Sequence, residues 1–388
     1  MAKCGVGSSV LTDAKAAGKQ AAEKAVAGLG KAKMAFVYSS VAYDNNALYA
    51  GVKEALPGVP IVGNTSFTGV VTPEGFVGGD SGFVGILAVG GDEVTAGIAG
   101  VKKDKCARKA GKEAAAAAMK NAGKDTPPDC FYMVAPPGEE ETYLKGITDI
   151  IGRKPFFGGS AADNAIAGEW VLGTGDTGVY ADGVAVAFFW GLGMTNLFTG
   201  AYRETEDVGI ITKVRDKRVL VEIDGEPAVK KYAKWAGVDP DSLKGGNLLV
   251  YTITSPLGVK DRLGDLIAIR HPMNGNDDYS MNIGADLAEK TAVIRMAGSV
   301  DELIQSAGAT LTALKDKAGG DVAGYHLVHC GGRRAGIGDR IGELVSVVKG
   351  AAGGVPFLME FTFGEYGYED DGNNTTGGLM LSYTAFKA

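Results

Sequence analysis

Two segments of this chain combine glycines with short polar side chains that could bind a small polar ligand. The first runs from Gly63 through Asn64 and Thr65 to Ser66, and the second runs from Gly158 through Gly159, Ser160 and Asp163 to Asn164. Backbone amides freed by glycine, together with hydroxyl and amide groups, can hold such a ligand. An ordinary turn is the alternative, since Asn and Ser often bond to their own backbone. The sequence contains no GxxxxGK[ST] pattern, so a P-loop is excluded.

A second group of charged and polar residues lies near the C-terminus. Arg333 follows Cys330 at the end of an expected strand, where its guanidinium could form two parallel hydrogen bonds with a carboxylate. Glu365 is expected at a strand end, where its carboxylate could meet an amine or a guanidinium, and Asn374 adds a hydrogen-bonding group nearby. We therefore expect Arg333 and Glu365 to share a cavity between two halves of the protein, suited to a ligand with an acidic and a basic group. A surface arginine, a buried structural cysteine and an acidic surface hairpin are the alternatives.

The histidines offer little support for a metal site or for catalysis. His326 and His329 lie three positions apart on an expected strand, so they face opposite ways and cannot hold one metal together. The third histidine, His271, precedes a proline in an expected loop. The sequence has no GxSxG or HExxH pattern and no Ser-His-Asp set. We expect no catalytic site and no metal site.

The polar segments belong to a repeated strand–helix–strand pattern. Pro155 and Gly158 stand 95 residues after Pro60 and Gly63, and Phe131 stands at the same offset from Phe36. A looser third copy runs from 325 to 358. Such duplication sets the architecture, and here it predicts that 34–66 superposes on 129–161 with Pro60 over Pro155. Ligands of α/β sheets gather beyond strand ends, so the two polar segments should line one cavity.

The remaining pattern predicts a mixed α+β protein, with mixed sheets covered by helices. Strands at 82–89 and 94–101 flank a Gly-rich turn and predict a hairpin, and strands between 169 and 202 predict a meander. A further strand is expected at 247–253. The pattern changes near Gly225, so we expect two domains, 1–225 and 226–388.

Composition narrows the classes of function. The chain has 388 residues with a formal net charge of −7, and it has no cluster of Lys and Arg interleaved with aromatics, so a nucleic-acid partner is not expected. No apolar run is long enough for a membrane span, and the N-terminus lacks a signal-peptide pattern. Four scattered cysteines without a CxxC pair are typical of reduced thiols. A cytoplasmic protein without a membrane partner is expected. The 60 glycines predict tight turns and close backbone approaches.

Taken in order along the chain, these stretches resemble the FIST family, which has an N-terminal and a C-terminal half. The N-terminal resemblance rests on Gly7-Ser-Ser-Val10 and on the segments 60–66 and 155–163. The segment 219–228, with Asp224-Gly-Glu-Pro-Ala228, resembles the junction between the two halves of the family. The C-terminal resemblance rests on Cys330-Gly-Gly-Arg333, on 355–358, and on Glu365 and Asn374. Met359-Glu360 departs from the Gly-Phe that many members carry, which changes the local pocket.

The resemblance implies an intracellular signal-input protein that binds a small ligand such as an amino acid. It also implies that a separate signalling output protein is the partner, because this chain carries no kinase, cyclase or chemoreceptor segment. Some members are haem-containing nitric-oxide sensors, so a haem-binding gas sensor is the alternative function. His271, His326, His329, Cys330 or a methionine would then be the axial ligand. An enzyme with chemistry around Cys330, and a scaffold, are the further alternatives.

Overall fold

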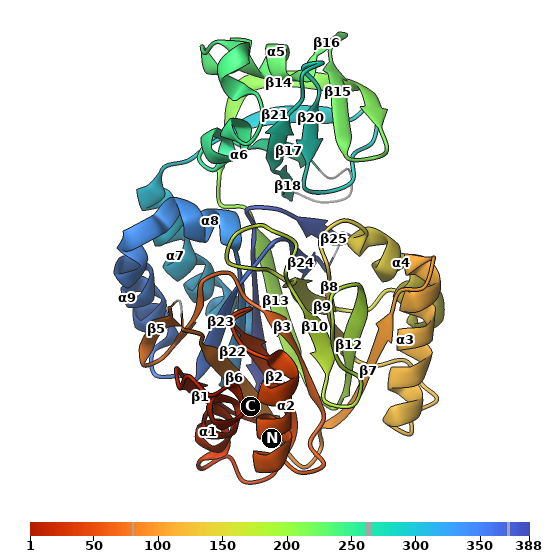
Figure 1. Cartoon of the computed structure of the whole chain (residues 1–388), viewed down its shortest axis with the longest axis vertical. Coiled ribbons are helices and arrows are strands. Elements are labelled where there is room, and N and C mark those ends of the chain that lie inside the picture. The colour runs from red at the N-terminus through yellow and green to blue at the C-terminus, as the bar shows by residue number, and fades with distance from the viewer. Residues whose placement is uncertain (80, 261–265, 371–372) are drawn as a thin grey trace.

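The computed structural model describes residues 1–388 except 80, 261–265 and 371–372. Figure 1 shows a large body and a smaller lobe above it. The lobe spans 203–297, and the body comprises the rest of the chain. The expected mixed α+β class is confirmed, since both parts combine mixed sheets with helices. Among the described residues, no helix is both long and apolar enough to cross a membrane.

The body consists of three units with the same order of elements: strand, helix, strand, helix, strand, hairpin, strand. The first unit contains β1 (Lys3–Ser9), α1 (Ala14–Val26), β2 (Ala32–Ser39), α2 (Asn45–Ala55), β3 (Ile61–Thr65), β4 (Gly69–Thr72), β5 (Gly75–Gly78) and β6 (Val84–Gly90). The second contains β7 (Thr95–Lys102), α3 (Ala107–Asn121), β8 (Cys130–Ala135), α4 (Glu140–Ile151), β9 (Phe156–Ser160), β10 (Leu172–Thr174), β11 (Gly178–Tyr180) and β12 (Gly183–Trp190). The repeat predicted from the sequence therefore extends well beyond a strand–helix–strand unit.

The third unit is interrupted after its first strand by the lobe. It contains β13 (Met194–Thr199), α7 (Val300–Ala318), β22 (Val322–Cys330), α8 (Gly331–Ile337), a 3₁₀ turn (Gly338–Arg340), α9 (Ile341–Ala352), β23 (Phe357–Thr362), β24 (Glu365–Tyr368), β25 (Asn374–Gly377) and β26 (Leu381–Lys387). The lobe therefore lies where the first two units have only a short connection.

The three units exchange their hairpins in a cycle. The hairpin β10–β11 of the second unit extends the sheet of the first, in the order β1-β6-β2-β3-β10-β11. The hairpin β24–β25 of the third unit extends the sheet of the second, next to β9. The hairpin β4–β5 of the first unit extends the sheet of the third, next to β23. Each sheet is thus completed by another unit.

Backbone register confirms that the units are equivalent. The amides of Ala35, Phe131 and Tyr325 donate to Pro60, Pro155 and Pro356 at 2.9, 3.0 and 2.9 Å. Pro155 therefore superposes on Pro60, as expected, and Pro356 gives the third copy. The match of Phe36 with Phe131 is wrong by one position, because Phe36 pairs with Val62 whereas Phe131 pairs with Phe156.

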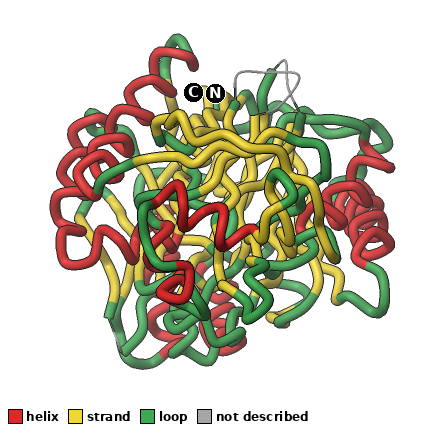
Figure 2. Tube along the Cα trace, turned by 90° about the horizontal axis from the view of Figure 1, so that it is seen from above, coloured by secondary structure: helices red, strands yellow, loops and turns green. Residues whose placement is uncertain are grey.

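The core of the body lies where the three sheets face one another. The rings of Phe36, Tyr132 and His326, one from each unit, lie 5.0 to 5.7 Å apart. Helices cover the outer faces of the sheets, and they lie at the periphery in Figures 1 and 2. This arrangement buries both faces of each sheet, which explains why the strands read as continuous apolar runs.

Glycines allow the paired helices to approach closely. A Cβ atom on Gly51 of α2 would lie 1.9 Å from the carbonyl oxygen of Lys15 in α1. The second unit repeats this contact, since a Cβ atom on Gly146 of α4 would lie 2.1 Å from the carbonyl oxygen of Arg108 in α3. Part of the high glycine content therefore serves helix packing, in agreement with the expected close backbone approaches.

The lobe is an eight-stranded sheet with short helices. It contains β14 (Arg203–Arg215), β15 (Val219–Ile223), β16 (Glu226–Pro227), α5 (Ala228–Ala236), a 3₁₀ turn (Pro240–Leu243), α6 (Asn247–Thr252), β17 (Leu257–Lys260), β18 (Ile267–Arg270), β19 (Pro272–Gly275), β20 (Met281–Ile283) and β21 (Ala292–Ala297). The junction expected near Gly225 falls inside this sheet, between β15 and β16. The strand expected at 247–253 is wrong, because these residues form α6.

Two expected strand pairings are also wrong. The strands β6 and β7 exist, but β6 pairs with β1 and β2, whereas β7 pairs with β12 in another sheet. The strands between 169 and 202 are distributed over three sheets and form no meander. The strands β10 and β11 pair with each other, whereas β12 and β13 lie in two other sheets.

Candidate functional site

The polar segments of the first two units meet at the carboxyl ends of their strands. The amide of Ala162 donates to the carbonyl of Thr65 at 2.9 Å, and the amide of Thr68 donates to Oδ1 of Asn164 at 3.0 Å. The third unit joins them, since the amide of Phe363 donates to the carbonyl of Ser160 at 3.2 Å. The structure therefore brings these segments together, as the duplication predicted.

Most of the side chains expected to bind a ligand have partners within the protein. The Ser66 hydroxyl bonds to the backbone of Gly69 and Phe361, and the Thr65 hydroxyl bonds to the backbone of Val171. The Ser160 hydroxyl bonds to the side chains of Glu140 and Tyr366. The backbone of Gly159 pairs with that of Glu365 between two strands. The Asp163 carboxylate accepts bonds from the amides of Ala165, Ala167, Gly168 and Glu169. Burial raises the pKa of Asp163, but these amides outweigh it and hold the pKa below its ordinary value. Asn64 and Thr65 lie within β3 and not in a loop.

Asn64 belongs to a buried polar cluster at the centre of the body, formed by Tyr38, Asn64, Tyr132, His326 and Glu360. Asn64 donates from Nδ2 to Glu360 Oε2 at 2.9 Å and accepts from the Tyr132 hydroxyl at 2.9 Å. Tyr38 bonds to Nε2 of His326, which lies 3.7 Å from Glu360 Oε1. Burial lowers the pKa of His326 to about 3 and raises that of Glu360 to about 8. Both groups are therefore neutral at pH 7.

Arg333 and Glu365 are both fully buried, but they have separate partners. The Arg333 guanidinium donates to the carbonyls of Gly200 and Leu303 at 2.7 and 3.1 Å, and to the Ser306 hydroxyl at 2.6 Å. Glu365 accepts from the Thr362 hydroxyl and the Met380 amide at 2.9 and 2.8 Å. Neither residue is among the described residues that line the four cavities of about 210 to 400 Å³. The hydrogen bonds of both side chains therefore connect segments of the protein to one another.

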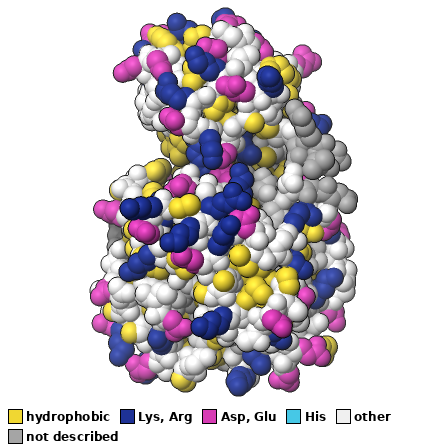
Figure 3. Space-filling view, turned by 90° about the vertical axis from the view of Figure 1, so that its right-hand side faces the viewer, with side chains coloured by type: hydrophobic (Ala, Val, Ile, Leu, Met, Phe, Trp, Pro, Cys, Tyr) yellow, Lys and Arg dark blue, Asp and Glu magenta, His cyan; other side chains and the backbone are white. Residues whose placement is uncertain are grey.

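A cleft between the lobe and the body is the best candidate for a binding site. Two adjoining cavities of about 400 and 340 Å³ lie there and share Lys145, Arg270 and Asp286 in their linings. Their volumes fall within the range of small-molecule sites. Figure 3 shows the constriction at this level, with Lys and Arg side chains gathered along it and just below it. Asn374 lines the smaller cavity, so one of the expected binding residues does lie in the cleft.

An ion-pair cluster links the lobe to the body beside this cleft. Arg218 of the lobe bonds through Nη2 to Glu140 at 2.6 Å and to Glu141, both on α4, and through Nε to Asp286 at 3.0 Å. Burial raises the pKa of Glu140 in spite of Arg218. For Glu141, Arg218 and the Thr376 hydroxyl outweigh burial, so its pKa is lowered. We call Arg218, Glu140, Glu141 and Asp286 the latch.

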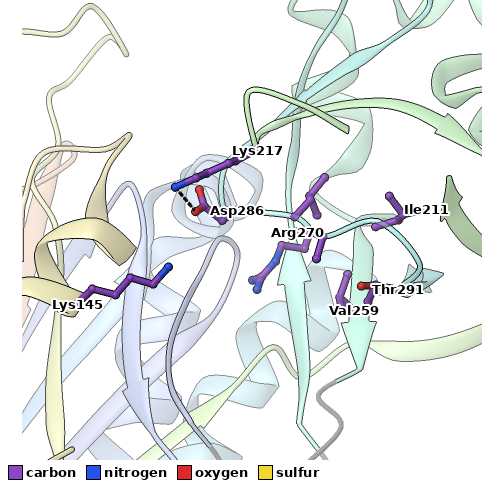
Figure 4. Close-up of a pocket in the computed structure, with 9 residues that line it drawn as sticks. Lys145, Ile211, Lys217, Val259, Arg270, Asp286 and Thr291 are labelled. Atoms are coloured by element: carbon purple, nitrogen blue, oxygen red, sulfur yellow. Dashed lines mark ion pairs between the residues drawn. The ribbon is translucent and has the colours of Figure 1, made fainter. Parts of the chain in front are cut away.

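Lys145 and Arg270 face each other across the cleft (Figure 4). Lys145 projects from α4 of the body, and Arg270 projects from the end of β18 in the lobe. Arg270 is anchored by donation from Nη1 to the carbonyl of Thr376 at 2.9 Å. No hydrogen bond or ion pair engages the Lys145 ammonium group among the residues that the structure describes. Lys145 and Arg270 place positive charge on both sides of this space, which favours an anion there.

The sequence did not identify these two cations as site residues. Lys145 was one of several charged residues on an expected helix, and Arg270 ended an expected strand. The only local indication of a site was that the expected apolar strand 266–270 ends in an arginine. Their proximity depends on the position of the lobe.

The described residues do not fit a haem. His326 and His329 are fully buried within packed clusters, and His271 is directed at the carbonyl of Leu249 at 3.3 Å. Cys330 caps α8 through its sulfur, which accepts from the amides of Gly332 and Leu379 at 3.3 and 3.1 Å. None of the cavities described is lined by a histidine, a cysteine or a methionine.

Two family models match nearly the whole chain. The FIST N domain matches residues 33–226, and the FIST C domain matches residues 228–368. No curated protein sequence matches at a significant level.

Solved structures give only distant matches. A cyanuric acid hydrolase from A. caulinodans shares 9% identity over 100% of both chains, with a TM-score of 0.35. A second cyanuric acid hydrolase shares 11% identity over 100% of both chains, with a TM-score of 0.33. Phosphoribosylformylglycinamidine synthase II from Thermotoga maritima shares 12% identity, over 100% of this chain and 72% of that chain, with a TM-score of 0.21.

Proposed function

Because the chain belongs to the FIST family, whose domains are sensory domains of signal transduction proteins, we propose that it binds a small polar ligand through an anionic group in the cleft between lobe and body. The observation that carries this proposal is the opposition of Lys145 and Arg270 across a space of suitable volume. An amino acid meets the requirement, since its carboxylate can lie between the two cations. The proposal assigns binding to this chain, and not catalysis.

The latch provides a route from binding to a signal. Lys145 belongs to the body and Arg270 to the lobe, so an anion between them contacts both parts. A ligand shifts a conformational equilibrium only by its difference in affinity between the two states. A ligand that contacts both cations stabilises the orientation in which lobe and body are closed on each other. The output passes to a separate signalling protein that distinguishes these orientations.

The binding step can be tested by calorimetry with amino acids and small carboxylates. A charge-assisted hydrogen bond contributes about 1.5–3 kcal/mol, so Lys145→Ala should weaken binding by roughly 10- to 100-fold. Lys31→Ala is the matched control, because Lys31 is exposed on the body far along the chain from α4. The same affinity in Lys145→Ala as in the control, or no binding of any carboxylate to folded protein, would contradict the proposal.

A further inference from the structure

The two cavities of the cleft differ in chemistry on either side of the cations that they share. The larger cavity is lined on the lobe side by Ile211, Val259, Leu287, Ala288 and the β-branched Thr291. The smaller cavity is lined by hydroxyl and amide groups of Thr148, Asn373, Asn374, Thr375 and Thr376. Figure 4 shows Arg270 between Lys145 on one side and Ile211, Val259 and Thr291 on the other, and Arg270 also lines the smaller cavity. A ligand held at the cations therefore has an aliphatic surface on one side and a polar surface on the other.

The aliphatic surface is part of the packed core of the lobe. Ile211 is fully buried, and Val259 and Leu287 are half-buried against the same core cluster. Their positions are set by the strands and core around them, so this surface exists before a ligand arrives. Covering its exposed part removes apolar area from water without a large cost in ordering.

We infer, on the basis of the proposed function, that the ligand is an amphipathic monocarboxylate whose aliphatic chain lies on Val259, Leu287 and Ala288, above the buried Ile211. The carboxylate is held between Lys145 and Arg270. An amide or hydroxyl group on the ligand is accommodated by the smaller cavity. N-acylated amino acids and short-chain hydroxy or keto acids belong to this class.

The charges of the lobe side favour a single anionic group over two. Lys217 is the further cation there, and it is paired with Asp286 at 3.7 Å. Asp286 is also bonded to Arg218 of the latch. A second carboxylate on the chain would therefore lie against aliphatic side chains and near the Asp286 carboxylate. Such a group loses its water without gaining another cation among the described residues that line this cavity.

The test is a calorimetric series of straight-chain monocarboxylates from acetate to octanoate, with adipate as the dicarboxylate matched to hexanoate. Burying one methylene corresponds to roughly a threefold to fourfold change in affinity. We expect affinity to rise by about this factor per methylene until the surface is covered, and we expect hexanoate to bind at least tenfold more tightly than adipate. Val259→Thr keeps the shape of the side chain and should reduce the gain per methylene. Val208→Thr is the control, because Val208 is exposed on β14 of the same lobe.

The outcomes separate this inference from the proposed function. If carboxylates bind in a manner that depends on Lys145 but affinity is flat with chain length, or adipate equals hexanoate, the aliphatic assignment is overturned and the anion site stands. An unchanged gain per methylene in Val259→Thr, relative to Val208→Thr, overturns the assignment to this surface. If no carboxylate binds, or Lys145→Ala has no effect, the proposed function fails together with the inference.

Discussion

Replacing Glu360 by glutamine should change how the stability of the protein depends on pH. Glu360 lies on β23 at the centre of the body and is fully buried. Asn64 donates to its Oε2, and Oε1 lies 3.7 Å from Nε2 of His326. The other titratable groups around it, Tyr38 and Tyr132, are neutral hydroxyls whose pKa values burial raises. Burial raises its pKa from 4.5 to about 8, because no cation among the described residues compensates for the removal of this carboxylate from water.

The magnitude follows from the difference in pKa between the folded and the unfolded chain. Below about pH 4.5 the carboxyl group is protonated in both states and does not oppose folding. As the pH rises from 4.5 to about 8, the unfolded chain loses this proton while the folded protein keeps it, so stability falls. Each pH unit corresponds to about 1.4 kcal/mol, so the free energy of unfolding decreases by roughly 5 kcal/mol over this interval. Above about pH 8 both states are ionised and the loss is complete.

Glutamine has nearly the same shape and does not ionise, so Glu360→Gln should be free of this loss. Urea unfolding of the variant and the parent protein at several pH values between 5 and 8.5 gives the two free energies of unfolding. The variant should gain stability relative to the parent as pH rises, by up to about 5 kcal/mol. Glu206→Gln, at an exposed position of the lobe, is the control and should show a constant difference. A constant difference for Glu360→Gln would refute the reasoning, because it would mean that the carboxyl group titrates normally in the folded protein.

Three other substitutions test separate features of the structure. Arg218→Met leaves Glu140 and Glu141 of the latch without the cation that they share, and it should lower the free energy of unfolding by about 3–5 kcal/mol and speed proteolysis between lobe and body. Arg333→Lys cannot reproduce the bonds of the guanidinium to Gly200, to Leu379 and to α7, so urea unfolding should show a loss of about 2 kcal/mol whether or not ligand is present. A loss confined to ligand affinity would return Arg333 to the binding site. Gly51→Ala should lower the melting temperature because its Cβ atom would overlap the carbonyl of Lys15, whereas Gly350→Ala, with open space in α9, should raise stability by up to about 1 kcal/mol. Equal effects of the two glycine substitutions would contradict the role given to helix packing.

The repeated units were accessible from sequence because their register is local. Pro60 and Pro155 each precede a buried strand that pairs in parallel with the strand one helix earlier, so spacing along the chain reflects the fold. The pairing of β6 and β7 was not accessible in this way. A Gly-rich turn looks the same whether the strands on either side of it pair with each other or continue into different sheets.

The candidate site illustrates the same limit for side chains. Asn64 was singled out because of its residue type, but its partner Glu360 comes from the third unit and could not be recognised as a neighbour. The fork-shaped guanidinium of Arg333 was expected to meet an acid, whereas the fold surrounds it with carbonyl groups. Lys145 and Arg270 become a pair only when the inserted lobe lies over the body. Residue type indicates what a side chain can do, and long-range contacts decide what it does.

The cyclic exchange of hairpins has a consequence for how the protein is made. During synthesis the edge of β3 is uncovered until β10–β11 has emerged, and the edge of β9 is uncovered until β24–β25 follows, close to the end of the chain. The hairpin β4–β5 emerges early and has no partner until β23 is complete. Exposed strand edges are sites of aggregation, and contacts between distant segments form slowly. The ring of three units therefore closes only after translation is almost complete. A fragment ending at the family boundary near residue 226 contains every strand of the first sheet, but it lacks strands of the other three sheets to which it contributes.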